Sequence, residues 1–160
     1  MNRAGFTLIE LVMVIVLLGI LAVYAAPKLG SISTVKASAF ADKLRADIRY
    51  AQTLAMSSGM RYRIYVNTAP SPASGYAVVN DSNADGWGTT GAGEYAKDPS
   101  GSGNLSVTLN TGDYTGITIS PAATIEFDSL GKPTLGGGTV LTVSPGGATV
   151  TITAQTGAVN

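Results

Sequence analysis

Apolar residues are distributed unevenly along this chain, and they are most concentrated near its start. From Phe6 to Ala26 there are 21 residues with a single charge, Glu10. At about 1.5 Å of rise per residue, a helix of that length can cross a hydrocarbon core of about 30 Å. The run therefore predicts a transmembrane helix. A carboxylate in such a span is costly, so Glu10 either lies at headgroup level in a plain anchor or marks a functional site with a partner.

Beyond Pro27 the apolar positions continue at a helical period in a more polar sequence. Spacings of three or four are typical of an amphipathic helix with one buried stripe, and they connect Leu29, Ile32, Val35, Ala39, Phe40, Leu44, Ile48, Ala51 and Leu54. We expect this half of the helix to occupy residues 27–58 and to end before Gly59, because glycine readily forms a helix C-cap. The expected core residues are Phe40, Leu44, Ile48 and Leu54.

Charged residues occupy the remaining faces of this predicted helix: Lys36, Asp42, Lys43, Arg45, Asp47 and Arg49. The pairs Asp42–Arg45 and Lys43–Asp47 have helical spacing, and each stabilises a helix by a few tenths of a kcal/mol. We interpret the group as a solvated face. The alternative is a set of contacts between subunits in a filament.

Two residues disturb the helical pattern. Gly19 weakens a helix by up to about 1 kcal/mol relative to alanine. Pro27 lacks an N–H group, and its ring opposes the carbonyl of Val23. We therefore expect a kink or a local break at Pro27, with residues 19–27 as the flexible part of the helix.

From Met60 onward the pattern changes to short β segments separated by Gly, Pro, Asn and Asp. Residues 60–66 alternate between apolar and polar, as in a strand with one buried face. Further strands are expected at residues 75–79, 105–109, 116–120, 124–127, 139–144 and 148–153, with a long loop at 80–104. The fold class is therefore α+β, in which a long N-terminal helix packs on an antiparallel sheet or small β-sandwich. This head is expected at residues 59–160.

Composition excludes several classes of chemistry. The 160 residues include 10 Lys and Arg and 10 Asp and Glu, so no net basic charge attracts nucleic acid. Cysteine and histidine are both absent, which rules out disulfides and triads of the Ser-His-Asp or Cys-His type. Glu126 and Asp128 form a candidate carboxylate pair on one strand face, but no Gly-rich phosphate loop or histidine base accompanies them. An enzyme is not expected.

The residues before the apolar run change its interpretation. In a secretory signal peptide the small-residue cleavage site follows the apolar region, whereas here Ala4 and Gly5 precede it. The segment Gly5-Phe6-Thr7-Leu8-Ile9-Glu10 closely resembles the processing site of type IV pilins and type II secretion pseudopilins. The resemblance implies a type IV pilin-like fold and a leader, residues 1–5, that a prepilin peptidase removes after Gly5 before methylating Phe6. Glu10 and Pro27 match residues typical of the family's helix.

Cleavage after Gly5 would create a free α-amine on Phe6 at the edge of the bilayer. A lone amine and a lone carboxylate are both costly there, and a pair of them costs much less. Glu10 lies four residues beyond Phe6, so a pair within one helix is one alternative. A pair with a neighbouring subunit's Phe6 would also set the axial register, and this is our hypothesis. Gly19 and Pro27 are the other expected assembly residues.

The head extends the resemblance over most of residues 6–160. An aromatic-Val strand runs into an Asp/Asn-rich turn between Gly75 and Gly86, and a Phe-x-x-x-Gly-x-Pro turn follows at residues 127–133. Both features resemble the GspH/FimT group of minor pseudopilins and minor pilins. DNA-binding pilins of the FimT type carry basic C-terminal segments, whereas residues 134–160 here contain no Lys or Arg.

One turn has the opening pattern of a calcium loop, in which alternating oxygen ligands are followed by a glycine. The candidate metal site comprises Asp81, Asn83, Asp85, Trp87 and Glu94. An EF-hand loop would need a glutamate at position 92, which is Ala92; Glu94 lies two residues later, and Asp98 is a further candidate. The alternative is an ordinary polar turn, where Asn, Asp and Gly are favoured for backbone reasons.

Three function classes follow. We favour a structural subunit, a minor pilin or minor pseudopilin, of a type IV pilus or type II secretion pseudopilus. The second class is a DNA-binding minor pilin for DNA uptake, whose candidate surface is Arg61, Tyr62, Arg63 and Tyr65; the neutral net charge makes nucleic acid an unexpected partner. The third is a membrane-tethered enzyme.

The resemblance also implies location and partners. The chain would be a single-pass protein of the inner (cytoplasmic) membrane, with its head in the periplasm or outside, and would later enter a filament. Lys and Arg near the span show no decisive bias, so this orientation depends on the resemblance. The implied partners are the prepilin peptidase and other pilin or pseudopilin subunits.

Overall fold

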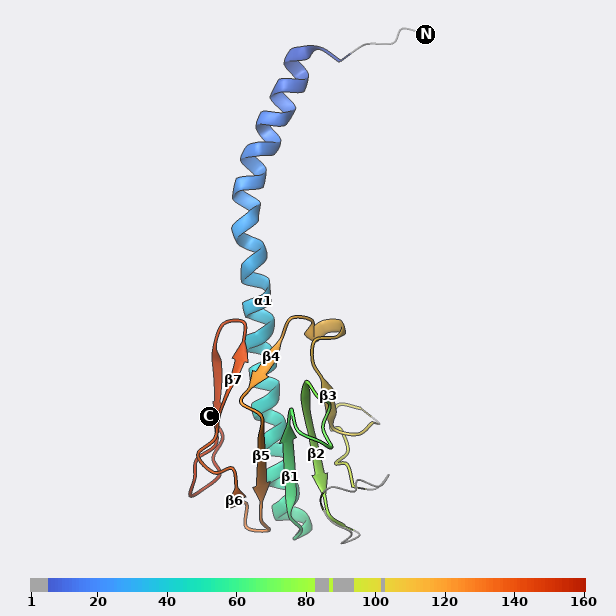
Figure 1. Cartoon of the computed structure of the whole chain (residues 1–160), viewed down its shortest axis with the longest axis vertical. Helices are drawn as coiled ribbons and strands as arrows, with labels where there is room; N and C mark the ends of the chain where they lie inside the picture. Colours follow the sequence, from blue (N-terminus) through green and yellow to red (C-terminus); the bar gives the residue numbers. More distant parts are fainter. Residues whose placement is uncertain (1–5, 83–86, 88–93, 102) are drawn as a thin grey trace.

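The computed structural model describes residues 6–82, 87, 94–101 and 103–160, and for residues 25–31 the backbone only. Its main element is one helix of 51 residues, α1 (Leu8–Ser58), whose first half projects from the head and whose second half lies against the strands (Figure 1). The predicted end of this helix is confirmed. Gly59 adopts the left-handed conformation at φ 70°, and its N–H donates to the carbonyl of Ala55 at 3.1 Å.

In the described part of the chain, strands and one 3-10 turn follow α1. They are β1 (Tyr62–Val66), β2 (Gly75–Asn80), β3 (Ser106–Thr108), η1 (Gly112–Tyr114), β4 (Thr118–Ser120), β5 (Ala123–Phe127), β6 (Pro133–Leu135), β7 (Val140–Ser144) and β8 (Ala148–Thr151). All except β6 fall within or next to predicted strands. We did not predict β6, because it is short and begins with Pro133, which cannot donate a ladder hydrogen bond.

The strands form two antiparallel sheets, and the predicted α+β class is confirmed. The larger sheet has the order β3-β2-β1-β5-β6, and the smaller sheet has the order β4-β7-β8. Strand β1 is central to the larger sheet, where Ile64 lies opposite Val78 on one side and Ile125 on the other. These three residues form a buried row across the middle of the sheet.

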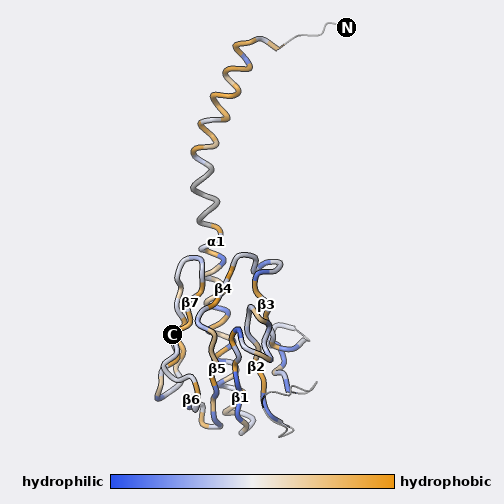
Figure 2. Tube along the Cα trace, viewed as in Figure 1, coloured by the Kyte–Doolittle hydropathy of each residue, from blue (hydrophilic) through white to orange (hydrophobic). Residues whose placement is uncertain are grey.

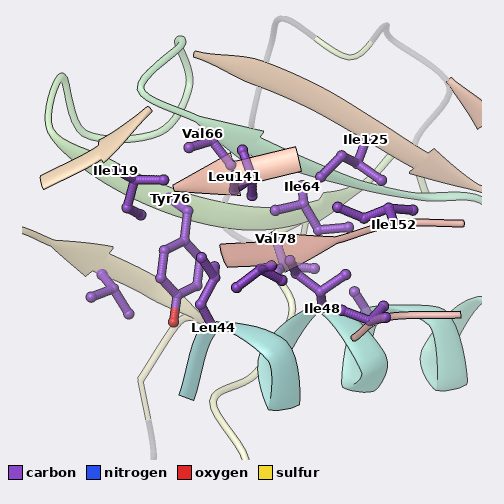
Figure 3. Close-up of a cluster of buried hydrophobic side chains, with 14 of the residues drawn as sticks. Leu44, Ile48, Ile64, Val66, Tyr76, Val78, Ile119, Ile125, Leu141 and Ile152 are labelled. Atoms are coloured by element: carbon purple, nitrogen blue, oxygen red, sulfur yellow. The ribbon is translucent and has the colours of Figure 1, made fainter. Parts of the chain in front are cut away.

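Both sheets share one core with the second half of α1, as Figure 3 shows for side chains from the helix and both sheets. The buried helix residues are Ala37, Phe40, Ala41, Leu44, Ile48, Ala51 and Ala55. The predictions for Phe40, Leu44 and Ile48 are confirmed, whereas Leu54 is only partly buried. The small alanines let the strands approach the helix closely.

The predicted apolar stripe is wrong at its N-terminal end. Ile32 and Val35 are 54% and 67% exposed, and Ala39 is exposed as well. The helical period continues through these positions, but the helix residues that enter the core begin only at Ala37. Periodicity therefore identified the face of the helix correctly but overestimated the length that the head covers.

The break predicted at Pro27 is wrong for this structure. Helix α1 runs without interruption from Leu8 to Ser58, and Figure 1 shows it gently curved. A proline removes one hydrogen bond from a helix, and here long helical segments continue on both sides of it. Any loss of helix between Gly19 and Pro27 would have to arise on packing with other subunits.

Candidate functional site

The N-terminus of α1 is closed by a reciprocal pair of side chains, Thr7 and Glu10. The Glu10 amide donates to Thr7 Oγ1 at 3.3 Å, and Glu10 Oε2 accepts from the Thr7 amide at 3.2 Å and from the Thr7 hydroxyl at 3.0 Å. This is a capping box, which satisfies donors that the first helical turn leaves unpaired. Glu10 thus has a partner that we did not predict, although the Thr-x-x-Glu spacing was visible in the sequence.

The projecting half of α1 presents an apolar surface on all sides. Every large hydrophobic residue from Phe6 to Tyr24 is at least 40% exposed, and Figure 2 shows this half coloured mainly as hydrophobic. A side-chain carbon added at Gly19 would meet nothing within 4 Å. Exposed apolar surface of this extent marks a site of contact with protein or lipid, and Gly19 leaves room for another helix to approach closely.

A helix must be both long and apolar to cross a bilayer. Among the residues whose side chains the structure describes, no helical stretch is both long and apolar enough for a bilayer crossing.

A second group of interacting side chains lies on the face of the larger sheet that points away from α1. Strand alternation turns Tyr62, Ile64 and Val66 toward the core, so Arg63 faces outward, opposite Glu126 on β5. Arg63 Nε donates to Glu126 Oε2 at 2.5 Å, and Arg61 Nη1 donates to Glu126 Oε1 at 3.2 Å. The Thr134 hydroxyl donates to the same Oε1 at 2.7 Å.

Trp87 covers this group. Its ring centroid lies 4.1 Å from Arg63 Cζ and 5.6 Å from Arg61 Cζ, which is within the range of cation–π contacts. The Tyr65 hydroxyl donates to the Trp87 carbonyl at 3.2 Å and accepts from Arg63 Nη1 at 3.2 Å. The long loop is therefore fastened to β1 at Trp87.

The electrostatics of this group are those of a fixed ion pair. Burial would raise the pKa of Glu126, but hydrogen bonds from Thr134 and Arg63 and the charges of both arginines lower the pKa below its ordinary value. Burial would lower the pKa of Arg63, whereas its hydrogen bonds to Tyr65 and Glu126 raise that pKa. Glu126 is thus ionised at neutral pH and is unsuited to donate a proton.

The structure gives little support to the surface predicted for DNA. Tyr62 faces the core, Tyr65 is buried, and Arg63 is bound to Glu126 and Tyr65. Of the four predicted residues, Arg61 alone has a mostly exposed side chain, and it too contacts Glu126. Stacking of bases needs accessible aromatic faces, which these two tyrosines do not present.

Only part of the predicted metal site can be located, because Asn83 and Asp85 lie outside the described residues. Asp81 and Trp87 line one hollow together with Arg61, whereas Glu94 is buried and its carbonyl accepts from the Asn80 amide at 2.8 Å. Within the described ranges no group of three acidic residues could hold a metal ion. The calcium site stays a prediction.

The two carboxylates of the predicted catalytic pair have separate structural roles. Glu126 belongs to β5 and is bound by the arginines, whereas β5 ends at Phe127 and Asp128 lies in the turn that follows. Asp128 Oδ1 accepts from the amides of Leu130 and Lys132, both at 2.9 Å. The expectation that both acids share one strand face is wrong, since the strand ends between them.

Asp47 was predicted on a solvated face, and this prediction is wrong. It is buried, and its Oδ2 accepts from Lys43 Nζ at 2.8 Å and from the Tyr76 hydroxyl. Burial together with the charge of Asp47 raises the pKa of Tyr76 well above its ordinary value. Asp47 follows Leu44 by three residues and Phe40 by seven, so its helical position next to the core was a signal that the sequence offered.

Other polar residues of α1 bind the C-terminal half of the chain. Arg45 Nη2 donates to the Thr149 carbonyl at 2.7 Å, Arg49 Nε donates to the Val159 carbonyl at 3.1 Å, and Gln52 Nε2 donates to the Gly131 carbonyl at 2.6 Å. Backbone carbonyls carry no sequence signal, so these contacts could not be predicted. They attach both the smaller sheet and the chain end to the helix.

Two known sequence families match the chain. The prokaryotic N-terminal methylation motif matches residues 1–26, and the type II transport protein GspH family matches residues 41–157, which is more than half of the chain. No curated protein sequence is significantly similar. The two matches together cover the apolar N-terminal segment and most of the head.

Solved structures of similar shape include the type IV minor pilin FimU of Pseudomonas aeruginosa (strain PAO1) in two crystal forms. The P65 form is 16% identical, with a TM-score of 0.45, and the similarity covers 75% of this chain and 87% of that chain. The P21 form is 14% identical, with a TM-score of 0.46, and the similarity covers 86% of this chain and 90% of that chain.

Proposed function

This chain belongs to the type II transport protein GspH family, and we propose that it acts as a minor structural subunit of a type IV pilus or type II secretion pseudopilus. Membership makes it a pilin or pseudopilin subunit rather than an enzyme. The observation that carries the proposal is the division of α1. Its second half is built into the core of the head, while its first half is apolar and exposed and needs a partner.

Maturation is proposed to remove residues 1–5 by cleavage between Gly5 and Phe6, followed by N-methylation of Phe6 by a prepilin peptidase. The match of the N-terminal methylation motif to residues 1–26 supports this step. The position of the helix cap supports it as well. Thr7 and Glu10, which form the capping box, both follow the proposed cleavage position, so cleavage after Gly5 would keep these two capping residues in the mature chain.

Before assembly the subunit is proposed to be anchored in the inner membrane by residues 6–26, with the head in the periplasm or outside. The sequence supports this anchor with 21 residues that carry a single charge. In the filament, the same apolar surface would pack against the helices of other subunits. The open space around Gly19 favours such close packing.

Glu10 is proposed to bind the Phe6 amine of a neighbouring subunit in the filament. In the free subunit its carboxylate accepts hydrogen bonds from Thr7, which reduces the cost of a charge in an apolar setting without neutralising it. A neighbouring amine would supply the missing positive charge. The Thr7 cap and the amine can act together, since a carboxylate accepts several hydrogen bonds.

The full chain should be expressed in a host that carries a pilus or secretion assembly system, and sheared filaments should be analysed by mass spectrometry. The expected mature form begins at a methylated Phe6. We expect Glu10→Ala and Glu10→Gln to reduce incorporation by about tenfold or more, while Thr7→Ala, which removes the cap but keeps the carboxylate, has a smaller effect. An unprocessed chain in filaments would contradict the maturation step, and normal incorporation of both Glu10 variants would contradict the pairing.

A further inference from the structure

A groove of about 280 Å³ lies between α1 and the η1 region, at the end of the head from which the helix projects (Figure 1). Phe40 and Ile117 in its wall are buried, and the rings of Phe40 and Tyr114 pack edge to face with their centroids 5.1 Å apart. The wall of the groove is therefore apolar and aromatic. The complete lining is Lys36, Ala39, Phe40, Lys43, Asp113, Tyr114 and Ile117.

Exposed apolar residues of α1 extend this groove along the helix. Val35 precedes Ala39 by four residues, and Ile32 precedes Lys36 by four residues, so each lies one helical turn from a residue that lines the groove. Ile32, Val35 and Ala39 are all exposed, because the part of α1 that enters the core begins only at Ala37. The three residues form an apolar track that leads from the groove toward the projecting half of α1.

Lipid would not cover this track if residues 6–26 form the anchor as proposed. Ile32 and Val35 would lie about 9 and 14 Å beyond the end of that span, and Ala39 would lie about 20 Å beyond it. Exposed apolar surface outside the bilayer indicates contact with protein. The track follows one face of a helix, and the small side chain of Ala39 permits close approach, so its shape suits a second helix.

We propose that the groove and the track bind the apolar N-terminal helix of a different subunit in the filament. The partner is a different subunit because this chain is proposed to be a minor one, whose neighbours are mostly other subunits. The inference rests on the proposed function, since both need this chain to enter a filament. It adds a defined site on the head for one neighbour.

The position of the groove also determines which neighbour binds. If the two helices are parallel and numbered alike, position 39 meets the neighbour's residues 6–26 only when the neighbour is displaced by about 13 to 33 residues, or about 20 to 50 Å. Pairing of Glu10 with a neighbour's Phe6 amine needs a displacement of only about four residues, or about 6 Å. The helix in the groove therefore belongs to a second neighbour, distinct from the one that Glu10 binds.

Photo-cross-linking in assembled filaments can test this site. Lys36 at the groove is replaced in the full chain by a lysine analogue that carries a diazirine, and the chain is expressed in a host with the assembly system. Sheared filaments are irradiated, and the adducts are mapped by mass spectrometry. We expect adducts with the apolar N-terminal segment of another subunit, at least about fivefold more than from the same analogue at Lys132. Lys132 is a matched control, because it is exposed in the β5–β6 turn at the opposite end of the head (Figure 1).

Filling the groove separates binding in it from proximity along α1. Ala39→Trp places a large ring in the groove and should lower the Lys36 adduct about fivefold or more. Ala158→Trp is the matched control and should leave the adduct unchanged, because Ala158 is also exposed but does not line the groove. The thermal unfolding midpoints of both variants should equal that of the parent chain. An adduct that Ala39→Trp does not reduce would overturn the assignment to the groove.

The site of the adduct on the partner distinguishes the remaining outcomes. Adducts with lipid, with a second copy of this chain, or with the part of a neighbour's helix beyond its apolar segment would overturn the inference. So would a yield no higher than that from Lys132. In each of these cases the chain is still present in the filaments, and the proposed function stands. Absence of the chain from filaments that contain the other subunits would overturn both.

Discussion

Arg63 and Glu126 lie directly opposite each other on β1 and β5, and Arg63 Nε donates to Glu126 Oε2 at 2.5 Å. Glu126 is only 3% exposed although it faces away from the core. Arg61, Thr134 and the Trp87 ring complete a polar layer over this face of the sheet. The outer face near β1 is therefore a fixed network rather than a solvated surface.

Removal of Glu126 should destabilise the head strongly. Glu126→Ala removes the carboxylate that binds Arg63 and leaves this partly buried guanidinium without its acidic partner. Removing one member of a buried ion pair costs about 3 kcal/mol of folding free energy. Urea denaturation of the full chain in mild detergent at pH 7 would measure the free energy of unfolding. Thr124→Ala, two residues earlier on the same strand face, is the matched control and should cost about 0.5 kcal/mol or less. A cost for Glu126→Ala no larger than the control would contradict the role of the pair.

The same residue should make stability depend on pH on the acid side. The pKa of Glu126 is lower in the folded state than its ordinary value, so the unfolded state binds protons first as the pH falls. Its contribution is thus fully present above about pH 5 and is lost progressively as the pH falls through the folded pKa. Glu126→Gln should flatten this part of the stability curve. The pKa of Asp98 is also lowered, because its carboxylate accepts hydrogen bonds from Ser100. A smaller dependence of stability on pH, due to Asp98, should therefore remain in the Glu126→Gln variant.

The buried hydrogen bond between Tyr76 and Asp47 gives a third prediction. Tyr76→Phe keeps the ring and its packing against Phe40 but removes the hydroxyl that donates to Asp47. Loss of a partner for a buried carboxylate should cost about 1–3 kcal/mol. Tyr114→Phe is the control, because the Tyr114 hydroxyl makes no hydrogen bond to the described residues, and its cost should be near zero. Equal effects of the two substitutions would show that the hydroxyl of Tyr76 contributes little.

Much of the fold could be predicted because it depends on periodic burial. The spacing of Phe40, Leu44 and Ile48 identified the helix face that enters the core, and Gly59 identified the helix end. The alternation of Tyr62, Ile64 and Val66 correctly separated the core side of β1 from the side of Arg63. These signals are local. In the helix, residues three or four positions apart share a face, and in the strand, residues two positions apart share a face, so the burial of one residue predicts that of the next.

The polar contacts could be predicted only in part, because their partners are distant in sequence. Asp47 is buried by Tyr76, 29 residues later, and Glu126 is bound by Arg63, 63 residues earlier. The helical spacing of Asp47 from Leu44 and Phe40 indicates a position next to the core, but it does not indicate the partner, and nothing near Glu126 in the sequence distinguishes it from a solvated acid. The cap formed by Thr7 and Glu10 is the opposite case. Its three-residue spacing was available, but we interpreted Glu10 as a headgroup-level acid or as a partner of the Phe6 amine and not as part of a helix cap.

Gly75 should tolerate no side chain. It opens β2 with φ 146°, and a side-chain carbon built there would lie 2.0 Å from the carbonyl oxygen of Val107 on β3. Gly75→Ala should therefore separate these strands and cost about 3 kcal/mol or more. Gly101→Ala is the control, because that position has open space around it. A thermal unfolding midpoint for Gly75→Ala equal to that of Gly101→Ala would contradict this strand contact.

The calcium hypothesis can be tested through Trp87, the one tryptophan in the chain. Its ring lies over Arg63, and it lines a hollow with Asp81, so an ion bound by this loop should change its fluorescence. We expect a saturable response to calcium that Asp81→Asn and Asp85→Asn each weaken by about tenfold, because each substitution removes a charged ligand. Asp113→Asn, at the other end of the head, should leave the response unchanged. A response that fails to saturate, or that is the same in all three variants, would leave the Asp81–Gly86 segment as a polar turn stabilised by its backbone.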